Sequence, residues 1–239
     1  MLTWGELISS TWVFARLSCR IVFHRKLLFM VGGVLCYYGI LYGLAVFRPG
    51  EGFGAGQALH VLVEIPATVL AIYLTMDLVS RERDHNSLEI LFSTSTSHYG
   101  IWLFRLFSIY AVLLLTLMAM STLAYFLFAE FPFVRGGLNA FLPAFLVVNL
   151  TFFLAVLCRS GNTAGMLSLG VIILVLLTSE SLKGTPYFLF LNPLDPPMDA
   201  DNSLWVEEAL INRLAIAAAG TLFLFFALRR MEYREQLLA

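Results

Sequence analysis

The sequence predicts an all-α integral membrane protein with six transmembrane helices, preceded by an amphipathic interfacial helix. Composition is the first observation: 59% of the 239 residues are hydrophobic and only 13% are charged, whereas a soluble domain carries about 25% charged residues. Distribution is the second, because crossing the hydrocarbon core takes roughly 20 apolar residues per helix. The stretches that contain no Asp, Glu, Lys or Arg are 27–47, 106–129, 136–158 and 160–179.

Two further apolar stretches carry isolated charges and complete the expected spans. Residues 57–79 contain Glu64 and Asp77, and residues 209–229 contain Arg213. The first 26 residues are charged and lack a short apolar core, so no cleaved signal peptide is expected. A single transmembrane domain over residues 1–239 is therefore predicted. Its spans are about 27–47, 57–79, 102–129, 138–158, 162–182 and 209–229.

The distribution of Lys and Arg predicts the orientation of the chain. With the N-terminus inside, the cytosolic segments hold Arg16, Arg20, Arg25, Lys26, Arg81, Arg83, Arg105, Arg159, Arg229, Arg230 and Arg234. The outer segments hold Arg48, Arg135, Lys183 and Arg213. Because positive charge is enriched in cytoplasmic loops, both termini are expected in the cytosol. Residues 82–98 are then cytosolic, and the acidic loop 183–208 lies outside.

Residues 3–22 are expected to form an amphipathic helix before the first span. Apolar residues recur there at spacings of three and four, and Glu6 and Arg16 interrupt the apolar surface. With Trp4 and Trp12 at headgroup depth, this pattern is typical of a helix that lies along the inner leaflet. The alternative is a solvated stalk that extends the first span inward.

Ionisable residues inside the expected spans are candidates for a translocation path. His60 and Glu64 are one helical turn apart, so they share a face of the second span. Pro66 should kink that helix or force a local adjustment. An ionised carboxylate is costly against lipid, so Glu64 is expected to face protein or a water-filled path. Asp77, near the inner end of the second span, and Glu180, at the outer end of the fifth, are the other candidates.

The pair His60 and Glu64 has two interpretations. Imidazole and carboxylate are both metal ligands, and both can carry protons. Two ligands do not make a metal site, so a buried hydrogen-bonded pair is the preferred interpretation and no metal site is predicted.

The outer loop 183–208 also has two interpretations. It combines a short apolar run with prolines and five acidic residues, which is typical of a solvated loop. The alternative is a partly re-entrant cap over the outer exit, because apolar non-helical segments at membrane depth must be buried in protein.

The charged segment after the second span carries the strongest functional signal. Residues 82–98 are expected to contain a short helix. Leu88, Leu91 and Phe92 recur there at spacings of three and four, so they lie on one apolar face. Asp84 or Asn86 can cap that helix by satisfying free amides of its first turn. The segment is either a solvated connecting helix or a docking element that fits a groove on another protein.

This segment resembles the link between the second and third spans in the permease subunits of type-2 ABC transporters, a class of mostly exporting systems. In that family the link is similar to Glu-x-Glu-x-Gly-Thr-Leu-Glu-x-Leu-Leu-Ser-Thr-Pro. Here the matching residues are Glu82, Asp84, Ser87, Leu88, Glu89, Leu91, Ser93 and Thr94. Asn86 replaces the usual glycine and Ser95 the usual proline, changes that alter backbone freedom more than surface chemistry.

The resemblance covers nearly the whole chain and implies a multi-pass protein of a bacterial or archaeal cytoplasmic membrane. It implies that the chain forms the translocation path of an exporter and couples to two separate cytosolic ATPase subunits. A second permease copy or a related permease would complete the complex. The residues that this resemblance assigns to the ATPase contact are Glu82, Asp84, Asn86, Ser87, Leu88, Glu89, Leu91 and Phe92.

ATP and Mg are expected on the partner ATPase, and no cofactor is expected on this chain. A phosphate-binding loop needs a lysine after its glycines, and the only lysines, Lys26 and Lys183, lie in no such motif. The chain is therefore not expected to be an enzyme. Membrane lipid is the remaining expected partner, and no nucleic acid is expected.

Two other functions stand as alternatives. The run from Glu207 and Glu208 to Arg213 is similar to the Glu-Glu-x-x-x-Arg signature of intramembrane prenyl-protease-like enzymes. It has one residue too many before the arginine, and no companion His-x-x-x-Asn motif follows. A passive channel or scaffold is the other alternative, although it would not need the motif within residues 82–98.

Overall fold

The computed structural model describes residues 26–47, 54–79, 98–158, 160–182, 185, 187–192 and 202–231. The expected interfacial helix 3–22 and the proposed ATPase-contact residues between Glu82 and Phe92 lie outside this described part. Every regular element within it is helical, which confirms the all-α class there. The elements are α2 (Lys26–Phe47), α3 (Ala55–Leu59), the π-helix η1 (His60–Glu64), α4 (Ile65–Thr75), α7 (His98–Leu127), α8 (Phe133–Leu157), α9 (Gly161–Leu177), α10 (Ser179–Leu182) and α11 (Asn202–Met231).

Five helical stretches in the described part are long and apolar enough to cross a membrane. They are Leu28–Phe47, Gly56–Thr75, Trp102–Leu127, Phe133–Leu157 and Trp205–Met231. Large apolar side chains such as Phe107 and Leu115 are exposed on their outer faces. Such faces suit hydrocarbon, and helices satisfy their own backbone groups where water is absent. The helices thus have the length, composition and surface of a multi-pass membrane protein.

The fifth expected span, 162–182, is divided in the structure. α9 contains 17 residues and ends before Thr178, and the short helix α10 follows it. The Thr178 hydroxyl donates to the carbonyl oxygen of Leu174 at 3.0 Å, a side-chain bond that competes with the backbone ladder and bends helices. The described residues therefore provide five full-length spans, not the six expected, together with one shorter apolar helix.

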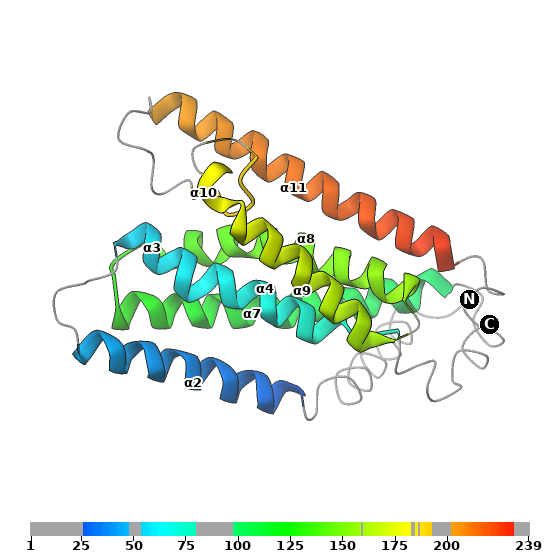
Figure 1. Ribbon diagram of the computed structural model, residues 1–239, viewed down its shortest axis with the longest axis horizontal. Helices are drawn as coiled ribbons and strands as arrows, with labels where there is room; N and C mark the ends of the chain where they lie inside the picture. The colour runs from blue at the N-terminus through cyan, green and yellow to red at the C-terminus, as the bar shows by residue number, and fades with distance from the viewer. Residues whose placement is uncertain are drawn as a thin grey trace, which may run out of the picture.

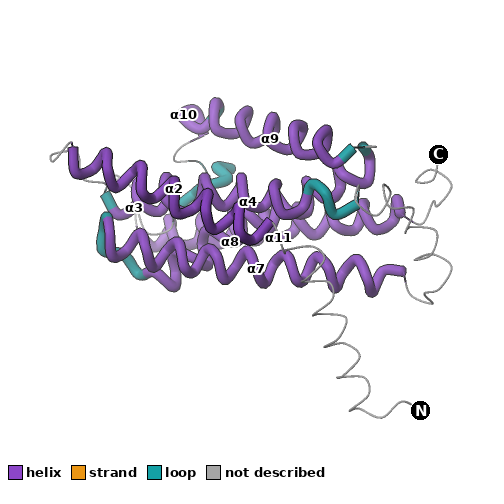
Figure 2. The backbone as a smooth tube through the Cα atoms, turned by 90° about the horizontal axis from the view of Figure 1, so that it is seen from below, coloured by secondary structure: helices purple, strands orange, loops and turns teal. Residues whose placement is uncertain are grey.

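α8 is the central helix of the bundle, since it packs against α4, α7, α9 and α11. Figure 1 shows these helices running along the long axis, and Figure 2 shows α7 and α9 on opposite sides of the bundle. α11 approaches α8 closely at Gly220, where an added Cβ would lie 2.7 Å from the Phe145 ring. Buried residues of α8 such as Val148 and Phe152 form part of the hydrophobic core.

The first and the last described helices of the chain, α2 and α11, have their outer ends at the same end of the bundle. α2 begins and α11 ends at one end of the molecule, whereas α3 and α10 lie at the other (Figure 1). An even number of passes along the bundle produces this arrangement. The position of α3 and α10 matters for the site, because His60 follows α3 directly in the chain.

Three helix boundaries differ from those expected. α7 begins at His98, the last residue of the expected cytosolic segment, and α8 begins at Phe133, before the expected start at 138. α11 begins at Asn202, well inside the expected outer loop. Trp205 and Ala209 are buried in a separate apolar cluster with residues of the segment 187–192, so tertiary packing extends the helix past its hydrophobic span.

Candidate functional site

The second span changes its helical winding where Glu64 lies. α3 passes into the π-helix His60–Glu64, and α4 then begins with Pro66 in its first turn. A proline has no amide hydrogen, and its ring clashes with the carbonyl four residues earlier. A π-helical turn relieves that clash, and such turns are frequent at functional sites. The local adjustment expected at Pro66 is confirmed and takes the form of this π-helix.

Two tyrosines of α2 bind carbonyl groups just before Pro66, which lacks the amide hydrogen that would serve one of them. The Tyr37 hydroxyl donates to the Val61 carbonyl oxygen at 2.7 Å, and the Tyr38 hydroxyl lies 2.9 Å from that of Leu62. In an α-helix residue 66 would donate to Leu62, and in a π-helix it would donate to Val61. Since no water replaces such bonds inside a membrane, α2 completes the second span. Sequence reasoning missed this role, although two adjacent mid-span tyrosines were visible.

Glu64 lies at the centre of a buried polar cluster. Its side chain is fully buried, and its Oε2 atom is 3.0 Å from Nδ1 of His60. Asn139 of α8 donates from Nδ2 to the other carboxylate oxygen at 3.1 Å. The predictions that Glu64 faces protein and that it pairs with His60 are therefore confirmed. Asn139 was not predicted to belong to the cluster, although asparagine side chains within spans commonly form hydrogen bonds between membrane helices.

Arg213 of α11 supplies a positive charge to the same region. Its guanidinium is buried and interacts electrostatically with the Glu64 carboxylate. It donates to the carbonyl oxygen of Leu189 at 3.5 Å and also to that of Leu191. Within the described part of the chain, its buried Nε atom has no hydrogen-bond partner. The sequence marked Arg213 as an isolated charge within a span and as the end of a run similar to a protease signature. It did not mark Arg213 as a partner of Glu64, because the two residues lie far apart in the chain.

The non-helical segment 187–192 packs over the imidazole of His60. The centroid of the Phe190 ring is 5.2 Å from that of His60, and the Phe188 centroid is 6.4 Å away. Both phenylalanines are buried. Asn212 donates from Nδ2 to the Phe188 carbonyl oxygen at 3.0 Å. For residues 188–191 the solvated-loop interpretation is wrong, and the interpretation of a segment buried in protein holds. Tyr187 is exposed, and residues 193–200 lie outside the described part.

Of the other translocation-path candidates, Asp77 does not join this cluster. Asp77 lies in the turn after α4, about 20 Å along the helix from Glu64 by the rise per residue. Glu180 falls within α10, and its side chain lies outside the described part. Among the described side chains, no group of three or more His, Cys, Asp or Glu residues is placed to hold a metal ion.

The arrangement can bind charged or polar groups. It combines a carboxylate, an imidazole, an amide and a guanidinium, held by three different spans and shielded by two phenylalanine rings. Fold and site together define a helical, multi-pass membrane protein with a buried polar cluster. No family model matches the chain, and neither a curated protein nor a solved structure matches it.

Proposed function

We propose that this chain is the membrane-spanning subunit of an ATP-driven exporter of the type-2 ABC class, with the Glu64 cluster on its translocation path. The observation that supports this most is the fully buried carboxylate of Glu64, bonded to His60 and Asn139. Ionisable residues within spans are rare and mark substrate or ion pathways. Interrupted helices are also typical of transporter binding sites, and the π-helix before Pro66 is such an interruption.

The proposed topology has six crossings with both termini in the cytosol. α9 and α10 together provide the fifth crossing, since about 17 residues are the lower limit for a spanning helix. The excess of Lys and Arg on one side sets the orientation. Under this topology α3, α10 and the segment 187–192 lie toward the outside.

The proposed coupling runs from residues 82–92 to the polar cluster through α4. These residues follow α4 in the chain, and α4 is continuous with the π-helix that carries His60 and Glu64. A displacement of α4 along its axis would shift Glu64 relative to Arg213, which belongs to α11. The electrostatic interaction between Glu64 and Arg213 would then strengthen or weaken.

The proposed partners are two cytosolic ATPase subunits and a second permease chain. ATP and Mg bind to the ATPase, and the contact on this chain is centred on Ser87, Leu88, Glu89 and Leu91. Leu88 supplies apolar contact area. Glu89 offers a charge-assisted hydrogen bond to a basic residue of the partner, the loss of which costs about 1.5–3 kcal/mol when the bond is desolvated.

The test is the double substitution Leu88→Lys with Glu89→Lys in the complex with its ATPase. Both positions lie outside the spans, so the chain should insert normally, while a lysine at 88 would place an unpaired charge in the contact. We expect loss of ATPase in a pull-down and loss of substrate-stimulated hydrolysis. Asp199→Lys, on the opposite side of the membrane, is the matched control and should behave as the unmodified chain.

Retention of both ATPase binding and transport by the double variant would refute the proposed coupling. A purified chain that transports its substrate without any ATPase would favour a passive channel. The intramembrane-protease alternative gains no support from the site, because Glu207 is exposed and the guanidinium of Arg213 is bound to backbone carbonyls.

A substitution at Glu64 tests the translocation path separately. Glu64→Leu removes the acceptor of His60 and Asn139 but conserves most of the buried volume. We expect transport to fall more than the yield of assembled complex. Asn162→Ala, at an exposed position of α9, is the control. If Glu64→Leu transports normally, the cluster has a structural role alone.

A further inference from the structure

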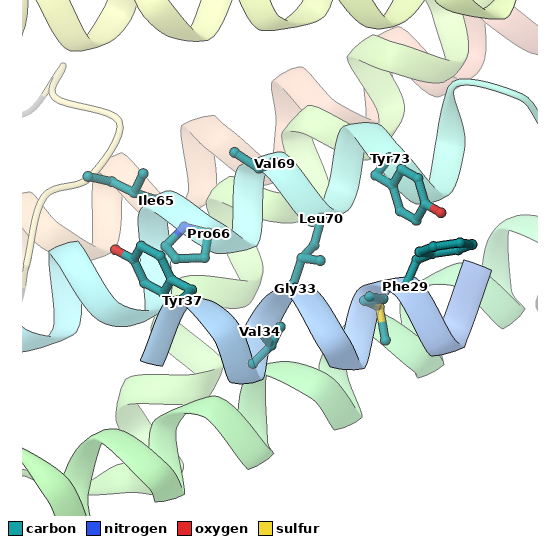
Figure 3. Close-up of a pocket in the computed structure, with 10 residues that line it drawn as sticks. Phe29, Gly33, Val34, Tyr37, Ile65, Pro66, Val69, Leu70 and Tyr73 are labelled. Atoms are coloured by element: carbon teal, nitrogen blue, oxygen red, sulfur yellow. The ribbon is translucent and has the colours of Figure 1, made fainter. Parts of the chain in front are cut away.

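α2 and α4 enclose an apolar cavity of about 520 Å³ within the described part of the chain. Figure 3 shows Phe29, Gly33 and Tyr37 on α2 facing Pro66 and Tyr73 on the second span. The cavity opens to the molecular surface, because several of its lining residues are themselves exposed, among them Phe29. It is separate from the Glu64 cluster, which lies between the second span, α8 and α11.

The cavity lies where α2 presents a glycine to the second span. Gly33 presents no side chain, and a Cβ added there would meet no heavy atom within 4 Å. In Figure 3 Leu70 of the second span lies opposite Gly33, and the ring of Pro66 lies beside Tyr37. At one end of the cavity the Tyr37 hydroxyl joins α2 to the backbone of Val61. The helices are thus bonded at that end and leave a hollow beyond it.

The length of the cavity matches one leaflet of a bilayer. From Phe29 to Tyr37, and from Ile65 to Tyr73, the helical rise gives about 12 Å. The hydrocarbon core is about 30 Å thick, so this length is close to half of it. Phe29 lies in the first turn of α2 and Tyr37 in its middle. The cavity therefore runs from one membrane surface toward the midplane.

We propose that this cavity binds one acyl chain of a membrane phospholipid, taken from the leaflet at the N-terminal end of α2. The walls are apolar and face hydrocarbon through the open side, so an acyl chain enters without losing any polar interaction. An unfilled cavity would forfeit dispersion contacts along its lining, and protein interiors contain few voids of such a size.

The sequence also provides charge for the lipid headgroup. Lys26 is the first residue of α2, and Arg25 precedes it in the sequence. Basic residues beside a membrane surface attract phosphate groups. The end of the acyl chain would meet Tyr37, the residue that supports Val61 in the π-helix. The bound lipid would thus reinforce the contact between α2 and the second span.

The test uses the purified chain in phosphatidylcholine vesicles that contain a phosphatidylcholine with a diazirine on its acyl chain. After illumination, mass spectrometry locates the labelled residues. We expect the label to concentrate on residues 29–37 and 65–73. Gly33→Phe should fill the cavity and lower this labelling about tenfold, which corresponds to about 1.4 kcal/mol of binding free energy.

Gly39→Phe is the matched control for Gly33→Phe. Gly39 also lies on α2 with no heavy atom within 4 Å of an added Cβ, but it does not line the cavity. Labelling in this variant should stay unchanged. Equal labelling of the two variants, or label spread evenly over the exposed faces of the spans, would overturn the proposal.

A second variant and a second measurement cover the remaining outcomes. Val69→Trp fills the cavity from the side of α4, where Val69 is exposed, and it replaces Gly33→Phe if that variant does not fold. Val69→Trp should also lower the labelling.

The substitution Gly33→Cys tests for a second copy of the chain on this face. Efficient disulfide formation between two Gly33→Cys chains in the vesicles would overturn the lipid assignment.

Discussion

The hydroxyl of Tyr38 lies 2.9 Å from the carbonyl oxygen of Leu62, a carbonyl that Pro66 cannot serve. The same hydroxyl is 2.9 Å from the carbonyl oxygen of Met120 on α7. One side chain of α2 therefore contacts the backbones of two other spans. α2 is otherwise largely exposed along its length, so these polar contacts contribute much of what fixes its position.

Tyr38→Phe should lower the stability of the folded chain. The substitution keeps the ring and its packing against Phe128 but removes the donor to Leu62. We expect the free energy of unfolding to fall by about 0.6–1.7 kcal/mol, which spans the average and the maximum contribution of a hydrogen bond between membrane helices. The measurement is unfolding in detergent. Tyr42→Phe, at an exposed residue of the same helix, should change stability by less than about 0.5 kcal/mol.

Asn139→Ala should destabilise the chain through Glu64. The substitution removes the donor to one oxygen of the fully buried carboxylate, and an unsatisfied buried polar group costs about 1–3 kcal/mol. A double-mutant cycle with Glu64→Gln isolates this interaction. Additive effects of the two substitutions would contradict it, whereas a coupling energy of about 1 kcal/mol is expected.

Arg213→Met should release the segment 187–192. The guanidinium holds the carbonyl groups of Leu189 and Leu191, and methionine conserves the apolar length of the side chain without its donors. We expect faster amide hydrogen exchange over 187–192. The rate should rise about tenfold or more if the free energy of opening this segment falls by more than about 1.4 kcal/mol. Arg230→Met, at an exposed position of α11, is the control. Equal exchange in both variants would show that apolar packing alone holds the segment.

Gly220→Ala should weaken the contact between α11 and α8. An added Cβ would lie 2.7 Å from the Phe145 ring, so the ring or the helix must shift, and overpacking of this kind costs about 1–3 kcal/mol. Thermal unfolding in detergent measures the effect. Gly170→Ala is the matched control, because no heavy atom lies within 4 Å of a Cβ added to that residue. A Gly220→Ala variant as stable as the control would show that α11 adjusts freely.

The part of the site that could be predicted from sequence is local. His60 and Glu64 are separated by one helical turn, so any helical winding close to α places them on one face, and the cost of a carboxylate against lipid predicts that Glu64 faces protein. Pro66 likewise predicts a disturbed helix because its missing amide hydrogen is a covalent property. Each of these inferences needs only the residues within two turns.

The partners that complete the site could not be predicted, because they come from distant segments. Asn139 lies 75 positions from Glu64 in the sequence, and Arg213 comes from α11. Many pairings of polar residues among the spans satisfy the same hydrophobic pattern. Helix packing selects one of them, through close approaches such as that of Gly220 to Phe145.

The sequence by itself determined that this is a helical membrane protein. Apolar stretches of membrane-spanning length have a favourable transfer free energy wherever they pack, and helices are the structure that satisfies their backbone in hydrocarbon. Tertiary structure alone decided the burial of Phe188, Phe190 and Leu191. It also decided which carbonyls Tyr37 and Tyr38 bind. These features depend on contacts between spans, and hydrophobicity does not discriminate between alternative packings, because lipid is as apolar as the side chains it replaces.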